Sequence, residues 1–438
     1  MSLRVWWGRV LVAGALAALP LAGLPAVAQA RWGRPFQFAG PGTLDVMPAQ
    51  LAISPGGAAA AAFGTQDVDT PGTSQGYLTL RSARGTVGKP VAVPGASQIL
   101  AAAYDRGSLE LLTGTTTAGQ VCCSSAQAVA VSGAGAPARP RTLVGGLTGA
   151  TLAQLQPLAD GQMLAAVATE RGVWVVQSAR ANRFGAQHLL TGGGVMPSAL
   201  ATAWLGGEST VVAWTGASGI AGAQDPRTIA YALGSRTSAP RRARTAVTVA
   251  AGHRVDELGV AARGAGPTVA WIESWVDDRG NYHSQVRATD IGPHATATTL
   301  SSAGRLASGL SFAADPAGDQ ALTWESCTAN DACVTQVAVR GAHGSFGSPR
   351  TLGAIDSSQT PALTVGPNGQ VVVAWIRGGR PVAAVSRGPG RGFGAASTLS
   401  SSTYAYDITL ASGPGGRALA ARTHGTLNPS VVAAAYAN

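Results

Sequence analysis

A glycine-containing turn followed by a short apolar run recurs through this 438-residue chain at nearly regular intervals. The stretch "VGPNGQVVVAW" (365–375) has near-copies in "ADPAGDQALTW" (314–324) and "ASGPGGRALAA" (411–421). The copies can be aligned on the last glycine of each turn, before the apolar run. This glycine falls at Gly57, Gly107, Gly161, Gly207, Gly266, Gly318, Gly369 and Gly416. The intervals run from 46 to 59 residues. A period of about 50 residues with variable loops is typical of a propeller or a repeat array.

Each repeat predicts four short strands. Apolar runs such as "STVVAW" (209–214) are too short for helices and are bounded by turn residues, so we expect buried strands there. A segment that alternates with period two, such as "VTQVAVRG" (334–341) or "RPVAAVSRG" (380–388), predicts a half-exposed strand. A third segment, "FGSPRTL" (346–352), and the strand before the glycine turn complete the unit. The glycine and proline residues supply the backbone angles that tight turns need, so we interpret the recurring phrase as structural.

The final repeat, 408–438, contains three strands, and the missing fourth lies at the other end of the chain. "WGRPFQF" (32–38) matches the pattern of "FGSPRTL". Closing a ring with strands from both termini removes two open sheet edges. The sequence therefore predicts an all-β, eight-bladed β-propeller that forms a single domain over 31–438; seven blades plus a separate hairpin is the alternative. The layout resembles the secreted, Ala/Gly-rich propeller repeat proteins of bacteria, and this resemblance of repeat pattern implies no functional residues.

The first 30 residues have the features of a secretory signal peptide. Arg4 and Arg9 precede an apolar run over 10–27, and Ala28-Gln29-Ala30 is a small-x-small cleavage pattern. A membrane anchor is the alternative, but Pro20 and Pro25 interrupt the run. No later stretch approaches the roughly 20 apolar residues of a membrane helix. We therefore expect an exported protein, extracellular or periplasmic, with no transmembrane segment after cleavage.

The formal net charge of +10 raises the question of a nucleic-acid partner. The arginines are scattered, and aromatic residues do not interleave with them. We therefore expect no nucleic-acid partner, and we expect a monomer.

The chain has four cysteines, an even number that favours disulfides in an exported protein. Cys327 and Cys333 flank the loop "CTANDAC" of the sixth blade, so their separation fits a bond across a hairpin. Cys122 and Cys123 lie in a loop of the second blade, too far around the ring to reach the other pair, and a vicinal disulfide is one outcome for them. No CxxC motif is present, so we expect no zinc.

Acidic residues concentrate in the segments that the blade pattern places on one face of the ring. With strands lettered A to D outward from the axis, these segments are the B–C loops and the D–A connections. Asp277 and Glu325 fall in or beside B–C loops, and Asp256, Asp356 and Asp407 fall in D–A connections. Loops held by a rigid scaffold are where binding residues concentrate. An acidic face on a basic protein favours cationic or hydroxyl-rich partners; the alternative is that loops are simply where charges are solvated.

The richest of these loops is "WIESWVDDRGNYHS" (271–284) in the fifth blade. The candidate binding residues are Glu273, Trp275, Asp277, Asp278, Asn281, Tyr282 and His283. Carboxylates and amides can hydrogen-bond sugar hydroxyls, and aromatic rings can stack on a sugar face. The same acids are compatible with Ca²⁺, although "DDRGN" lacks the alternating acids of an EF-hand loop. An ordinary solvated loop is the remaining interpretation, and we expect no other cofactor.

No catalytic motif is convincing. "GTSQG" (72–76) fits G-x-S-x-G but precedes a predicted strand, whereas a nucleophile elbow precedes a helix. "GPGRGFG" (388–394) has no Lys-Ser/Thr after it, so it is not a phosphate loop. Tyr404 and Tyr406 have no evident Glu partner of the kind that sialidases use. We therefore expect a non-enzymatic binding or scaffold propeller that recognises a glycan or an extracellular protein on its acidic face. A glycoside hydrolase or lyase that uses loop carboxylates is the alternative.

Overall fold

The structure is a computed structural model of the full chain. It describes residues 31–39, 45–66, 74–116, 123–147, 151–158, 161–179, 183–192, 197–205, 209–217, 226–263, 266–292, 296–401, 404–424 and 430–437. The proposed signal peptide and Cys122 lie outside these described residues. Within them, no helix is long and apolar enough to span a membrane.

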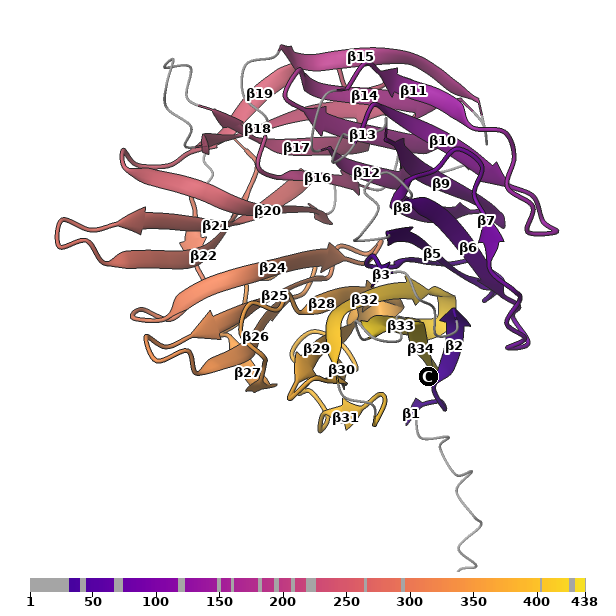
Figure 1. The fold of residues 1–438 in the computed structure, drawn as a ribbon. Helices are drawn as coiled ribbons and strands as arrows, with labels where there is room; N and C mark the ends of the chain where they lie inside the picture. Colours follow the sequence, from indigo (N-terminus) through magenta and orange to yellow (C-terminus); the bar gives the residue numbers. More distant parts are fainter. Residues whose placement is uncertain are drawn as a thin grey trace, which may run out of the picture.

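The described residues form eight antiparallel sheets arranged in a ring (Figure 1). Blade 1 contains β4 (Gln50–Ile53), β5 (Ala59–Gln66), β6 (Gln75–Arg81) and β7 (Val91–Ala92), and blade 2 contains β8 (Gln98–Asp105), β9 (Ser108–Thr115), β10 (Ser125–Val131) and β11 (Arg141–Gly145). Blade 3 contains β12 (Leu152–Pro157), β13 (Met163–Thr169), β14 (Gly172–Ser178) and β15 (Phe184–Gly192). Blade 4 contains β16 (Leu200–Trp204), β17 (Ser209–Ala217), β18 (Pro226–Ser235) and β19 (Ala243–Thr248). β3 (Asp45–Val46) adds to blade 1 by pairing with β5.

Blades 5 to 7 follow the same order. They contain β20 (His253–Arg263), β21 (Gly266–Val276), β22 (Tyr282–Asp290) and β23 (Thr298–Thr299); β24 (Leu306–Ala314), β25 (Gln320–Cys327), β26 (Cys333–Arg340) and β27 (Arg350–Ala354); and β28 (Ala362–Gly366), β29 (Gln370–Arg377), β30 (Arg380–Ser386) and β31 (Ser397–Thr398). Blade 8 contains β32 (Ala405–Gly413), β33 (Arg417–His424) and β34 (Ser430–Ala437), with β1 (Arg31–Trp32) and β2 (Phe36–Ala39) on its outer edge. Short 3-10 turns, η2 (Pro367–Gly369) and η3 (Pro414–Gly416), join the first two strands of blades 7 and 8.

The predicted ring closure is confirmed. Trp32 of β1 pairs with Tyr436, and Phe36 of β2 pairs with Ala433, so strands from both ends of the chain complete blade 8. In Figure 1 the indigo β2 lies beside the yellow β34. The predicted strand 32–38 is split in two, because the regular pairing is interrupted between Trp32 and Phe36, where the Gly33 N–H still donates to the Ala435 carbonyl at 2.8 Å. Eight blades, and not seven with a hairpin, are therefore present.

The recurring glycine turn joins the first two strands of a blade. Gly57, Gly107, Gly318 and Gly369 have φ of 84°, 94°, 93° and 69°, in the left-handed region that glycine adopts readily. At Gly369 a Cβ atom would also clash with the Asp319 carboxylate and with the Pro389 ring. The interpretation of the recurring turn as structural fits these positions, since the backbone of each turn adopts a positive φ that favours glycine.

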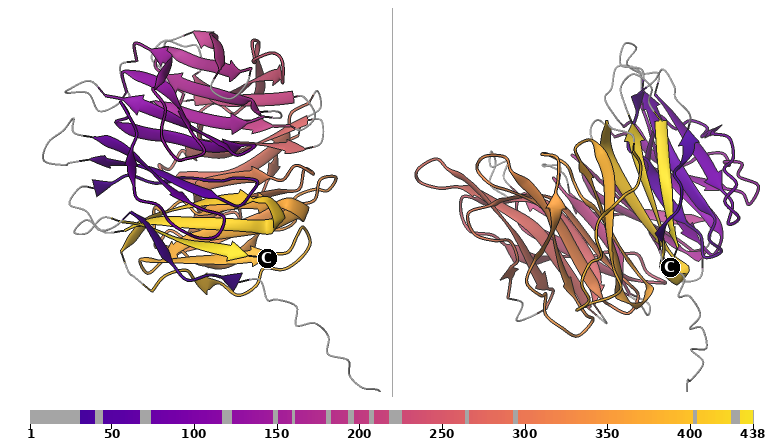
Figure 2. Two further views of the ribbon diagram at one scale, coloured as in Figure 1. Left: turned by 90° about the vertical axis from the view of Figure 1, so that its right-hand side faces the viewer. Right: turned by 90° about the horizontal axis from the view of Figure 1, so that it is seen from below.

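Hydrophobic side chains fill the spaces between neighbouring sheets, which pack face against face around the ring (Figure 2). Trp214, Trp271, Trp324 and Trp375, which end four of the apolar runs, are at most 2% exposed. The prediction of half-exposed strands in the period-two segments was wrong. β26 and β30 are buried along most of their length, because each blade is covered on both faces by its neighbours.

The Cys327–Cys333 disulfide is confirmed, with 4.0 Å between the two Cα atoms. The two residues are opposite each other in the pairing of β25 with β26. Cys123 is also disulfide-bonded, and the predicted vicinal bond involves Cys122, which lies outside the described residues.

Removing the Cys327–Cys333 bond is expected to lower the free energy of unfolding by about 2 kcal/mol, the value for a loop this short. The double variant Cys327→Ser/Cys333→Ser, compared with the oxidised parent by urea denaturation, measures it. A Thr328→Ser variant in the same loop is the control and should unfold like the parent. An unchanged midpoint for the double variant would show that the bond does not stabilise the blade.

Candidate binding site at the propeller axis

The innermost strands surround the axis and begin at one end of the ring. These strands are β4, β8, β12, β16, β20, β24, β28 and β32, and each contacts the next around a closed circle. The D–A connections lead into their first residues, and the B–C loops lie at the same end because strand direction alternates. The segments that carry most acids therefore share one face, which we call the loop face.

A cavity of about 640 Å³ lies on the axis near the loop face. Its walls come from blades 1, 3, 6, 7 and 8. Blades 3 and 7 stand opposite each other in a ring of eight, so only the axis is within reach of both. The polar side chains that line it are Gln50, Gln154, Ser311, Ser358, Gln359, Thr360, Tyr406, Asp407 and Thr409. A volume of this size with a few convergent polar groups is typical of a small-ligand site. We call it the axial pocket.

Tyr406 and Asp407 stand side by side at the start of β32, and both line the axial pocket. The Tyr406 hydroxyl donates to the backbone carbonyl of Val46 at 2.6 Å. Burial, followed by the nearby Asp407 and Asp45 carboxylates, raises the pKa of Tyr406 to about 12. Tyr406 is therefore a neutral phenol at physiological pH, and it lines the pocket.

Burial also raises the pKa of Asp407, and hydrogen bonding from Thr423 offsets part of this effect. Asp407 Oδ1 accepts from the Thr423 backbone N–H at 2.8 Å. Oδ2 is buried and has no hydrogen-bond partner in the described part of the chain. Because Oδ2 is buried, it is not presented directly to a ligand in the pocket. The raised pKa marks Asp407 as a candidate functional residue.

Two further buried carboxylates belong to blades 5 and 6, and the oxygens of both already accept hydrogen bonds. Glu257 accepts from the backbone N–H groups of Gly309 and Leu310 at 2.8 and 2.5 Å. Glu325 accepts from the Ser308 hydroxyl at 2.7 Å and from the Ser358 N–H at 3.0 Å. Burial raises the pKa of both groups. Their bonds fix the inner strands of blades 6 and 7, and through Ser358 they position one wall of the axial pocket.

The tip of the blade 5 loop is organised by Asp277. Its carboxylate accepts from the backbone N–H groups of Arg279 and Asn281, from the Asn281 amide and from His283 Nε2 at 2.9 Å. The hydrogen bond from His283, followed by those from Asn281, lowers the pKa of Asp277. The loop "DDRGN" thus makes a tight turn, and Gly280 adopts the positive φ of 82° that the turn requires.

Trp275 lies between two imidazole rings. His253, Trp275 and His283 are partners in adjacent strands, and the indole stacks on His253 at 4.7 Å and on His283 at 5.2 Å between ring centroids. Beneath them Glu273, 2% exposed, accepts from His253 Nδ1 at 2.6 Å and from Arg287 at 2.9 Å. These partners hold Trp275 and Glu273 in the blade.

The remaining candidates of this loop face solvent. Asp278 and Asn281 are exposed, and Tyr282 is 44% exposed. The Tyr282 hydroxyl donates to Asp256 at 3.3 Å. The structure therefore brings all seven predicted residues to one end of blade 5, and none of them lines the axial pocket.

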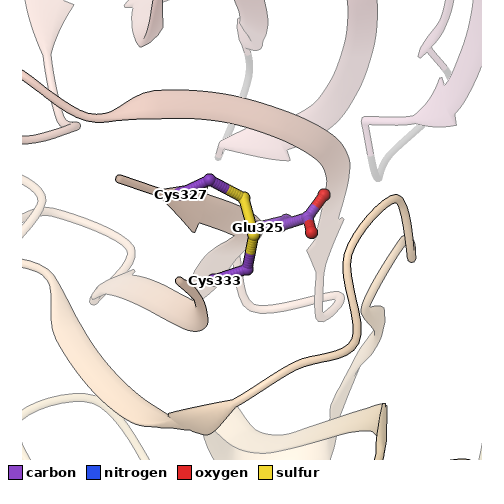
Figure 3. Close-up of side chains that lie close together, drawn as sticks. All are labelled: Glu325, Cys327 and Cys333. Atoms are coloured by element: carbon purple, nitrogen blue, oxygen red, sulfur yellow. A yellow bond between two sulfur atoms is a disulfide. The ribbon is translucent and has the colours of Figure 1, made fainter. Parts of the chain in front are cut away.

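One cluster of potential metal ligands is present among the described residues, formed by Glu325, Cys327 and Cys333 (Figure 3). The two sulfur atoms form the disulfide, so they are not thiolates that could bind a metal. The acids of the blade 5 loop do not form such a cluster within the described ranges.

The residues of the axial pocket were mostly missed by sequence reasoning. The sequence analysis considered Tyr406 and Asp407 separately and did not predict that they line one pocket. Gln154 and Ser311, which also line it, belong to blades far apart in the chain. Only the closed ring brings them together, so no local motif could have indicated them.

No protein-family model matches the chain, and no curated protein matches it in sequence. Its fold is similar to that of an ulvan lyase of polysaccharide lyase family PL25, solved bound to -[GlcA(1-4)Rha3S]-, with 12% identity, a TM-score of 0.50, and coverage of 79% of this chain and 93% of that one. A Dyadobacter fermentans protein of unknown function has 8% identity and a TM-score of 0.45, with 94% and 100% covered. The GH93 α-L-arabinofuranosidase of Fusarium graminearum has 11% identity and a TM-score of 0.39, with 64% and 91% covered. At such identities the likeness is one of fold.

Proposed function

We propose that the protein is an exported propeller that binds a carbohydrate in the axial pocket. The observation that carries the proposal is the lining of this pocket, where amides, hydroxyls, the Tyr406 ring and the Asp407 carboxyl converge. Sugars present hydroxyls to such groups and an apolar ring face to an aromatic side chain. The ulvan lyase of similar fold is itself bound to a sugar, which agrees with this choice of ligand class.

The blade 5 loop is a second contact region in this proposal. Asp278, Asn281 and Tyr282 offer exposed polar groups on the same face, and they would contact an oligosaccharide that extends outward from the axis. The covered faces of Trp275 make it a support for the loop and not a stacking platform. Export, through a signal peptide over 1–30, fits the disulfide and is tested by sequencing the N-terminus of the secreted protein.

A glycoside hydrolase or lyase is the second candidate function. The observation that favours it is Asp407, which lines the pocket and whose pKa is raised by burial, as the pKa of a proton donor is. The acids of Glu257 and Glu325, in contrast, are engaged with backbone and hydroxyl groups. A glycosidase needs two carboxyl groups that face the same bond, and Asp407 is the one that lines this pocket.

The test is a glycan-array screen of the purified protein, followed by a turnover assay on every glycan it binds. We expect binding without release of reducing ends or unsaturated products. Asp407→Asn should weaken binding about tenfold, because it alters one buried hydrogen-bonding group. Turnover by the parent that disappears in both Asp407→Asn and Tyr406→Phe would establish the enzyme instead. No binding to any glycan would contradict the proposal and favour an extracellular protein as the partner.

A further inference from the structure

The turn that joins β30 to β31 holds two arginines at fixed backbone positions. Ser386, at the end of β30, is fully buried, and its hydroxyl lies 3.0 Å from the carbonyl oxygens of Gly388 and Arg391. The Arg391 N–H donates back to the Gly388 carbonyl at 3.1 Å. Gly390 adopts a positive φ of 74° within this turn. Arg387 and Arg391 therefore stand at the two ends of a closed turn, and both are exposed.

A cavity of about 500 Å³ lies beside this turn, between the outer parts of blades 7 and 8. The outer strands are short here: β31 contains two residues, and the outer strand of blade 8 is interrupted after Trp32. In Figure 1, β31 and β1 are the outermost strands of these two blades. The turn leaves β30 at the end opposite the B–C loop, so it lies at the other end of the blade from the loop face. We call this cavity the rim pocket, and it shares no lining residue with the axial pocket.

Apolar and aromatic residues form the base of the rim pocket. Ala383 and Tyr436 are buried, and Val385, Phe393 and Trp32 are partly buried. The Trp32 and Tyr436 rings contact each other, with 5.4 Å between their centroids. Aromatic side chains bury the apolar surface of a ligand, and a sugar ring presents an apolar face of C–H groups to them. The base therefore suits a ligand that is built on a ring.

Two positive charges line the same pocket. Arg387 and Arg391 belong to its wall, and no acidic side chain in the described ranges does. Neither arginine has a hydrogen bond or an ion pair with another described residue. Burial raises the pKa of the Tyr436 hydroxyl, and the positive charge of Arg387 opposes this rise, so the Arg387 guanidinium lies near the base of the pocket. Guanidinium groups bind carboxylates and similar oxyanions through paired N–H donors. The rim pocket thus combines an apolar base with donors for an anion.

We propose that the rim pocket binds an acidic sugar, with its carboxylate or sulfate group held by Arg387 and Arg391 and its ring on the apolar base. A neutral sugar would leave both guanidinium groups without an acceptor, and a free inorganic anion would leave the base uncovered. The volume of the pocket is in the range of small-ligand sites. The inference shares the ligand class of the proposed function but not its site, because the axial pocket has a different lining.

The experiment measures binding of the full chain to uronate-bearing and sulfated saccharides, in separate sets, each beside its neutral counterpart. The parent is expected to bind at least one acidic saccharide about tenfold more tightly than its counterpart, as one charge-assisted hydrogen bond provides. High salt should reduce this preference, because the arginines are exposed and their charges are screened. Arg387→Gln/Arg391→Gln should abolish the preference. Arg84→Gln, at an exposed arginine in the corresponding turn of blade 1, is the matched control and should bind as the parent does.

Equal affinity of the parent for acidic and neutral saccharides would overturn the proposal, and so would a preference that persists in Arg387→Gln/Arg391→Gln. Gln154→Trp, in the axial pocket, separates the two sites: acidic saccharides should still bind to this variant at the rim, whether or not the axial pocket binds a carbohydrate. Loss of acidic saccharides in Gln154→Trp, with full affinity in the double arginine variant, would place them at the axis and contradict the rim site. Equal thermal midpoints of all variants and the parent verify that each variant is folded.

Discussion

The free energy of unfolding is expected to fall by about 3–5 kcal/mol when Trp375 is replaced by alanine. The Trp375 side chain is fully buried in the packing between blades 6 and 7, next to Val337 and Val365. Its indole N–H also donates to the Ala354 carbonyl at 2.8 Å. The substitution therefore opens a large cavity and leaves a carbonyl without its donor. Urea denaturation of the parent and Trp375→Ala measures the loss.

A matched pair separates packing from hydrogen bonding. Trp324 is equally buried, but its indole N–H has no partner within the described structure. Trp375→Phe should therefore cost about 1 kcal/mol more than Trp324→Phe, the net value of a buried hydrogen bond. A loss below about 1 kcal/mol for Trp375→Ala would mean that the blades do not depend on this packing.

Stability should increase by about 3 kcal/mol above pH 7 when Glu110 is replaced by glutamine. Glu110 of β9 is 3% exposed, and burial raises its pKa from 4.5 to about 7. The folded protein therefore holds this proton more tightly than the unfolded chain does. The stabilisation of the folded protein by the protonated Glu110 side chain is fully present below about pH 4.5 and is lost as the pH rises to about 7. Above pH 7 the free energy of unfolding no longer changes through this group.

Glutamine keeps the shape of the protonated side chain but cannot ionise. The free energy of unfolding of Glu110→Gln should therefore not fall through residue 110 between about pH 4.5 and pH 7. Urea midpoints of the two proteins at pH 4 and pH 8 test the difference, which should be close to zero at the lower pH. Glu170→Gln, at an exposed turn of blade 3, is the control and should match the parent at both. Equal stability of parent and Glu110→Gln at pH 8 would show that the folded protein solvates this carboxylate.

The architecture could be predicted because every blade repeats the same local sequence pattern. The turn glycines, the apolar runs and the match between 32–38 and the outer strands each depend on nearby residues, and pairing of Phe36 with Ala433 confirms the closure. Exposure was harder to predict. Period two in β26 indicated one solvated face, but in a propeller a neighbouring blade covers the second face as well.

The sites could be predicted only where they are local. The sequence placed Trp275 and His283 in one loop, but the imidazole of His253, 22 residues before Trp275, reaches the indole only through strand pairing. The axial pocket is less local still, since Gln154 and Asp407 meet only when the ring closes.

The most direct test of carbohydrate binding at the axis is the Kd of the strongest array glycan for two variants and the parent. Gln154→Trp places a large side chain on an exposed position of the pocket wall, while Asp278→Ala alters only the blade 5 loop. We expect Gln154→Trp to weaken binding at least a hundredfold and Asp278→Ala to weaken it less than tenfold. Full affinity in Gln154→Trp, with loss of binding in Asp278→Ala, would contradict binding at the axis and place the ligand on the blade 5 loop.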